Sequence, residues 1–111
     1  MKYLKNFENT KKNNYKVGDY IIVEYSCDSR DDILMKLKGF IDNTIGVLYS
    51  IDKYENGKIF VKYDNVPDGF IQFFNSVYDG YTKPFHLSQI VEYSDKKEDL
   101  EYLINANKFN I

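Results

Sequence analysis

Cys27 and His86 are the only cysteine and the only histidine of the chain, and together they could form a nucleophilic pair. Such a pair needs only closeness in the folded structure, so their separation along the chain does not exclude it. However, Cys27 follows an apolar segment that indicates a strand, and no asparagine or aspartate is obviously placed to orient the histidine. We therefore interpret His86 as a packed or surface side chain, and we expect no catalytic residue and no enzyme.

The spacing of the other polar residues indicates no metal and no cofactor. One cysteine and one histidine are too few ligands for a structural zinc site. Asp28, Asp31 and Asp32 crowd together, but a calcium loop needs acidic ligands at alternate positions with a central glycine. Their charge suits the N-terminus of a helix instead. Isolated turns, not a glycine-rich phosphate loop, account for three glycines: Asn56-Gly57, Asp68-Gly69 and Asp79-Gly80.

The charge balance bears on the class of partner. The chain has 15 basic and 17 acidic residues, a net charge of −2. A protein that holds nucleic acid through its phosphates needs a positive field, so this composition argues against nucleic acid without excluding it. A short basic arm within residues 1–20 is the one exception, because five lysines stand there against two acidic residues: Lys2, Lys5, Lys11, Lys12 and Lys16.

The sequence predicts a cytoplasmic protein with no membrane partner. A single cysteine allows no intramolecular disulfide. No apolar run approaches the roughly 20 residues that span a bilayer. The first residues also lack the apolar core of a signal peptide.

A chain of 111 residues is expected to form one domain, mainly of β-strands because tyrosine and phenylalanine are abundant. We expect an N-terminal arm over residues 1–16, a β-barrel over 17–94 and a C-terminal helix over 95–107. A short helix over 31–42 is inserted after the first strand. Alternating or apolar segments predict the strands: residues 20–25, 44–54, 58–64 and 89–93.

The register of the central hairpin follows from the parity of its apolar residues. A three-residue loop over 55–57 pairs Ile51 with Val61 and Tyr49 with Tyr63, which keeps the apolar residues on one face. A two-residue loop would place an apolar residue opposite a lysine. We therefore predict the three-residue loop, with its glycine at positive φ.

The opposite face of these strands still carries apolar side chains, among them Ile22, Leu48 and Phe60. A sheet with two apolar faces is normally covered on both. We expect the C-terminal helix to cover this second face. The alternative is that Ile22, Leu48 and Phe60 bind a partner.

Several segments carry a family resemblance. The chain resembles the small SH3-like barrels of the KOW and Tudor type, in which Gly-Asp opens the first strand and a 3₁₀ turn precedes the last. The matching segments are Val17-Gly18-Asp19, Ile45-Gly46-Val47, residues 59–64 and residues 85–90. The resemblance implies an SH3-like fold that binds proteins, peptides or nucleic acids, although fold alone does not set function. The whole chain also looks like short proteins of phage and low-G+C bacterial genomes.

The segment over residues 70–85 is irregular and aromatic, and it provides the main candidates for partner binding. Packing within a loop, a protein-binding surface and a stacking platform for nucleic acid all remain open for these side chains. The candidates are Phe70, Phe73, Phe74, Tyr78, Tyr81 and Phe85.

Together these observations predict a non-enzymatic protein-binding module, with a phage-encoded inhibitor or modulator of a host protein as one form of it. A KOW- or Tudor-like module associated with nucleic acid or the ribosome is one alternative. A structural subunit of a larger, virion-type assembly is another. The sequence leaves the oligomeric state open.

Overall fold

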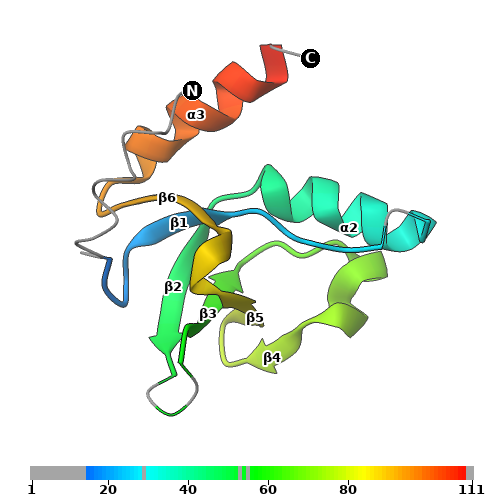
Figure 1. Ribbon diagram of the computed structural model, residues 1–111, viewed down its shortest axis with the longest axis horizontal. Helices are drawn as coiled ribbons and strands as arrows, with labels where there is room; N and C mark the ends of the chain where they lie inside the picture. The colour runs from blue at the N-terminus through cyan, green and yellow to red at the C-terminus, as the bar shows by residue number, and fades with distance from the viewer. Residues whose placement is uncertain (1–14, 29, 53, 55, 110–111) are drawn as a thin grey trace.

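The computed structural model describes residues 15–109 apart from residues 29, 53 and 55. The described part is an antiparallel sheet of six strands with two α-helices and two 3₁₀ helices (Figure 1). The strands are β1 (Tyr20–Val23), β2 (Gly46–Ile51), β3 (Lys58–Tyr63), β4 (Asn75–Val77), β5 (Gly80–His86) and β6 (Ile90–Ser94). The helices are α2 (Asp32–Asp42), η2 (Asp68–Phe73), η3 (Leu87–Gln89) and α3 (Lys97–Phe109).

The strands follow the order β4-β5-β3-β2-β1-β6, so the first strand lies beside the last. This arrangement confirms the predicted mainly-β class. Within the described residues β4 and β6 are the two edges of the sheet, so the sheet curls without closing into a barrel. The 3₁₀ turn expected before the last strand is present as η3, immediately ahead of β6.

The inner face of the sheet packs against α2. That helix begins after Asp31, whose side chain accepts hydrogen bonds from the backbone amides of Ile33 and Leu34, which is the geometry of an N-cap. Its buried residues join side chains of the strands in one cluster: Ile21, Val23, Leu37, Ile41, Leu48, Ile59, Val61, Tyr63, Val66 and Phe85. The predicted helix over 31–42 is therefore confirmed, and it supplies part of the core.

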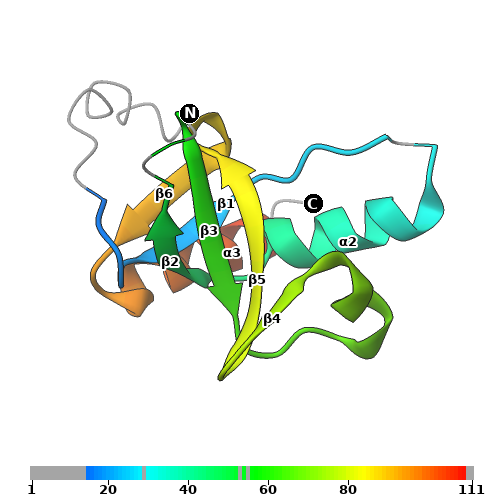
Figure 2. The ribbon, with the colours of Figure 1, turned by 90° about the horizontal axis from the view of Figure 1, so that it is seen from below.

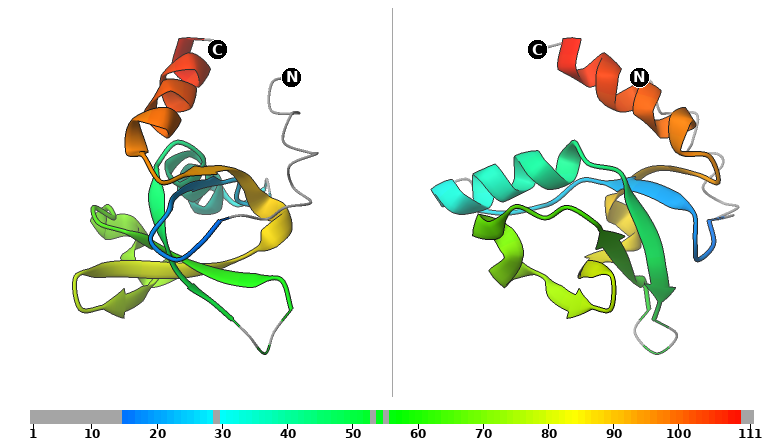
Figure 3. Two further views of the ribbon diagram at one scale, coloured as in Figure 1. Left: turned by 90° about the vertical axis from the view of Figure 1, so that its left-hand side faces the viewer. Right: turned by 180° about the vertical axis from the view of Figure 1, so that it is seen from behind.

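On the outer face, α3 packs mainly against β1 and β6 (Figure 3). Ile22 points away from its inward-facing neighbours and is buried against Leu100 and Ile104 of α3. The predicted cover by the C-terminal helix is thus confirmed for this residue. The helix begins at Lys97, two residues later than expected, and Ser94 accepts a hydrogen bond from the amide of Lys96.

The register of the β2–β3 hairpin differs from the prediction. Ile51 pairs with Ile59 and not with Val61, because the connection between the strands is longer than three residues. Leu48 pairs with Val61, because Tyr49 is an extra residue that forms a β-bulge. The parity argument assumed a continuous ladder, and a one-residue bulge reverses the facing of every position on one side of it. Leu48 is consequently buried in the inner core at 0% exposure, whereas Tyr49 is 46% exposed.

The loop of this hairpin agrees with the prediction in one detail and differs from it in another. The glycine of the connecting loop, Gly57, has a φ of 81°, as predicted. The predicted three-residue loop is wrong, because the amide of Asp52 donates to the carbonyl of Lys58 at 3.0 Å and the connection therefore spans residues 53–57. Glu55, which the sequence placed in a three-residue turn, and most of the N-terminal arm lie outside the described residues.

The segment over residues 70–85 is more regular than predicted. After η2, the strands β4 and β5 form a hairpin around a turn at Tyr78 and Asp79. Pro84 lies within β5, although proline donates no hydrogen bond to a ladder. The structure accommodates Pro84 because β4 pairs with β5 only as far as Thr82, so β5 has a free edge at the proline.

Candidate functional site

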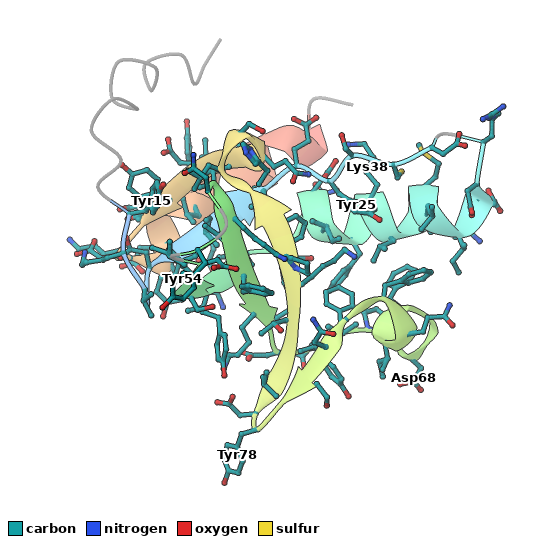
Figure 4. The ribbon with its side chains drawn as sticks, turned by 60° about the horizontal axis from the view of Figure 1, so that its bottom comes forward. Tyr15, Tyr25, Lys38, Tyr54, Asp68 and Tyr78 are labelled. Atoms are coloured by element: carbon teal, nitrogen blue, oxygen red, sulfur yellow. The ribbon has the colours of Figure 1, made fainter. Side chains whose placement is uncertain are left out.

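The structure disperses the six aromatic residues that the sequence singled out between 70 and 85. Phe85 is buried in the inner core, and four others are partly buried against it: Phe70, Phe73, Phe74 and Tyr81. Tyr78 alone is fully exposed, at the β4–β5 turn (Figure 4). Five of the six therefore pack in or against the inner core, and the six do not form one exposed aromatic surface.

The second group of predicted residues also separates. Ile22 lies under α3, and Leu48 lies in the inner core. Phe60 remains partly exposed on the outer side of β3. Of the three, only Phe60 is placed where a partner can reach it without displacing a helix.

Phe60 belongs to a surface on the outer side of β2, β3 and β5 that no described helix covers, which we call the open sheet face. Its other members are Val47, Tyr49, Lys62 and Pro84. Val47 lies directly opposite Lys62, and Phe60 lies directly opposite Pro84 in the strand pairing. Opposite residues of antiparallel strands share one face, so these side chains form a continuous strip. In Figure 2 these strands lie in front, with neither α2 nor α3 over them.

Two lysines frame the aromatic centre of the open sheet face. The ammonium of Lys58 lies 5.4 Å from the centroid of the Phe60 ring, a cation–π distance. Lys62 Nζ lies 3.1 Å from a carboxylate oxygen of Asp79 and 3.8 Å from one of Asp64. The hydrogen bond to Asp79 raises the pKa of Lys62, with smaller contributions from Asp64 and from the nearby Tyr49. The positive charge of Lys62 is therefore largely neutralised, and the face is more aromatic than basic.

Two exposed tyrosines mark the ends of the open sheet face. Tyr54 projects from the loop before β3, and Tyr78 projects from the β4–β5 turn, which lies beside the C-terminal end of β3 (Figure 4). The six residues of β3 span about 17 Å at the usual rise of a strand. Rings held at both ends of an uncovered strip can contact a partner that lies along its whole length.

The hypothetical pair of Cys27 and His86 is not assembled. Cys27 lines a groove of about 470 Å³ together with Met35 and Lys38, and its thiol donates to the carbonyl of Leu34 at 3.5 Å. His86 lines a separate groove of about 260 Å³ beside the β2–β3 loop. Its Nδ1 accepts a hydrogen bond from the amide of Ser88, so this nitrogen caps η3. Each side chain is hydrogen-bonded to a nearby backbone group, and no hydrogen bond joins the two.

The described residues hold no cluster of three or more His, Cys, Asp or Glu side chains that could bind a metal ion. None of the described helices is both long and apolar enough to cross a membrane. Comparison of the chain with protein-family models, with curated proteins and with solved structures finds no match.

The sequence analysis missed Tyr49, Tyr54 and Pro84 as surface residues. A proline inside an alternating segment is a usable signal, because it marks a strand edge that faces no neighbour. Tyr54 lies between Asp52 and a turn, where an exposed side chain is expected. For Tyr49 no local signal exists, since its exposure depends on a bulge within the β2–β3 ladder.

Proposed function

We propose that this protein is a non-enzymatic protein-binding module and that the open sheet face receives its partner. The observation that carries the proposal is the pair of Phe60 and Pro84 on the outer face, with the exposed Tyr49 near Lys62 on the same strands and no described helix over them in Figure 2. Aromatic side chains dominate the centres of protein interfaces and supply most of their binding energy. Charged residues stand around this strip, as they do at the rim of such interfaces.

The same architecture supports the proposal of an SH3-like relationship. Gly18 and Asp19 precede β1, η3 precedes β6, and β1 lies between β2 and β6. The β4 strand and the helix α2 are then additions to a five-stranded arrangement. The open edges distinguish this sheet from a closed barrel, and binding is argued from the face itself and not from the fold.

The proposal is tested by capture of partners on the tagged full chain. The chain is exposed to lysate of its source cells, with and without nuclease, and bound proteins are identified by mass spectrometry. We expect the double variant Tyr54→Ser/Tyr78→Ser to lose the partner that the parent chain retains after nuclease treatment. Tyr102→Ser is the matched control, because Tyr102 is also an exposed tyrosine but lies on α3.

Two outcomes contradict the proposal. Equal loss of the partner in the Tyr102→Ser control would place the interface on α3. Capture that disappears on nuclease treatment would favour the alternative nucleic-acid module. The isolated partner is then titrated against Phe60→Ser, which changes the centre of the face while leaving its ends intact. We expect this variant to weaken binding by about tenfold or more, the effect of removing an aromatic anchor.

A further inference from the structure

The loop between β2 and β3 ends in two adjacent residues that can react with each other. Asn56 and Gly57 are the only asparagine–glycine pair of the chain, and the Asn56 side chain is exposed. The backbone nitrogen that follows an asparagine can attack the carbon of the side-chain amide, because the two atoms then close a small, unstrained ring. Glycine favours this attack, since it has no Cβ to crowd the nitrogen and its backbone adopts many conformations.

Neither reacting group is held by a hydrogen bond within the described part of the chain. The side-chain amide of Asn56 and the backbone nitrogen of Gly57 have no such partner among the described residues. The fixed points lie beyond that nitrogen. The carbonyl of Gly57 accepts a hydrogen bond from the amide of Leu87 at 2.7 Å, and a Cβ on Gly57 would lie 2.5 Å from Nε2 of His86. Ring closure requires rotation about bonds of Asn56, and the anchor at the carbonyl of Gly57 does not fix these bonds.

Two other asparagines show the restraints that Asn56 lacks. The side chain of Asn43 donates a hydrogen bond to the carbonyl of Gly39 at 2.9 Å, which holds its amide away from the chain that follows. Asn75 is exposed and precedes Ser76, but both residues lie in β4, where pairing with β5 holds the backbone extended. Asn56 has neither a hydrogen-bonded side chain nor a place in a strand.

We propose that Asn56 is a site of spontaneous deamidation through a cyclic imide, and that the folded loop permits the reaction. Asparagine is among the residues that limit the chemical lifetime of proteins. A base from solvent removes the proton of the Gly57 nitrogen, and this nitrogen forms a bond to Cγ of Asn56. The bond from Cγ to Nδ2 breaks, and the side-chain nitrogen leaves as ammonia.

Water then opens the ring at one of its two carbonyl carbons. Addition at Cγ gives aspartate. Addition at the backbone carbonyl carbon gives isoaspartate, in which the main chain runs through the former side chain and is longer by one methylene. No atom is oxidised or reduced in either step.

Both products add one negative charge to the end of the hairpin. Asn56 lines the groove of about 260 Å³ beside this loop, together with His86 and Lys58. Pro84 lines the same groove and belongs to the open sheet face, so the new carboxylate lies at the border of that face. The reaction requires no partner, and the inference therefore does not depend on the proposed function.

The test follows the purified full chain over several weeks at neutral pH and physiological temperature, with peptide mapping by mass spectrometry. The peptide that contains Asn56 is expected to gain the mass that separates an amide from an acid, at a rate at least about tenfold above that of Asn75. Fragmentation spectra should identify both isoaspartate and aspartate, because direct hydrolysis of the side chain gives aspartate alone. Asn56→Gln is expected to slow the conversion by about tenfold or more, since glutamine must close a larger ring. Asn75→Gln is the matched control and should leave the rate at Asn56 unchanged.

The same measurement in urea separates the effect of the fold from that of the sequence. Unfolding is expected to accelerate the conversion of Asn75, which leaves its strand, and to change that of Asn56 by less than about threefold. Acceleration of Asn56 beyond about threefold would overturn the proposal, because the folded loop would then protect it. The absence of conversion, a rate at Asn56 less than about tenfold above that at Asn75, or aspartate without isoaspartate would overturn it as well.

Discussion

Replacing Leu48 or its neighbour Tyr49 by alanine distinguishes the two possible registers of the β2–β3 hairpin. In the structure Leu48 is fully buried among Val61 and the other residues of the inner core, and Tyr49 is 46% exposed. A buried leucine loses both its transfer free energy and its packing when it is truncated, and leaves a cavity. We expect Leu48→Ala to lower the free energy of unfolding by about 3–4 kcal/mol. Tyr49→Ala is expected to lower it by less than about 1 kcal/mol.

The size of the first effect sets the assay. A domain of this length has a free energy of unfolding of about 5–15 kcal/mol, so Leu48→Ala remains folded but with much reduced stability. Urea titration followed by far-ultraviolet circular dichroism gives the midpoint and the slope for each variant. Equal slopes ensure that the same transition is being compared. The two variants concern adjacent residues, so each serves as the control of the other.

The reverse order of stabilities would refute the bulge. A continuous ladder places Tyr49 opposite Tyr63 in the core and turns Leu48 outward. Tyr49→Ala would then cost several kcal/mol, as expected for truncation of a large buried side chain, and Leu48→Ala would be nearly neutral. Similar small effects in both variants would also contradict the structure, because they would leave Leu48 outside the core.

Three further predictions concern single side chains. Gly57→Ala is expected to lower the free energy of unfolding by about 1–2 kcal/mol because its φ is 81°, whereas Gly69→Ala, with open space around it, should change the thermal midpoint little. Tyr63→Phe is expected to leave the free energy of unfolding unchanged or to raise it by about 1 kcal/mol, since the lost hydroxyl has no partner among the described residues. A decrease of more than about 1 kcal/mol in urea titration would instead indicate that the hydroxyl makes a hydrogen bond. In NMR titration of the lysine side chains, Lys83 should lose its proton at lower pH than Lys62, because burial lowers the pKa of Lys83 and the bond to Asp79 raises that of Lys62. At pH values between the lowered pKa of folded Lys83 and 10.5, the unfolded chain binds the Lys83 proton more strongly than the folded chain does. Lys83 therefore makes the free energy of unfolding rise with pH in this range, and Lys83→Met should flatten that rise.

Local signals were sufficient for the elements whose ends are marked by side-chain chemistry. Asp31 caps α2 as its position before an apolar helical pattern suggested, and Leu37 and Ile41 face the core. The apolar stripe of α3 covers Ile22 as expected from the second apolar face of the strands. In these cases the residue types and their spacing are local signals, and the apolar faces that they mark then pack against one another.

The register of the sheet could not be obtained in this way. Whether Leu48 or Tyr49 faces inward depends on a bulge that is stabilised by β3, more than ten residues further along the chain. Gly46 shows the same dependence, because a Cβ at that position would lie 2.5 Å from a methyl group of Val61 on the partner strand. Such a close approach follows from the packing of two strands and has no signature in either segment alone.

The bulge also explains why the open sheet face includes Tyr49 and not the predicted Leu48. Under the continuous register, Leu48 and Phe60 would share the outer face, and an apolar patch would need a cover or a partner. With Tyr49 as the extra residue, Leu48 joins the core and a tyrosine takes its place beside Lys62. A tyrosine can remain in water because its hydroxyl is hydrated, yet it offers a ring to a partner. One inserted residue therefore both completes the inner core and places an exposed tyrosine ring on the outer face, where we propose that the partner binds.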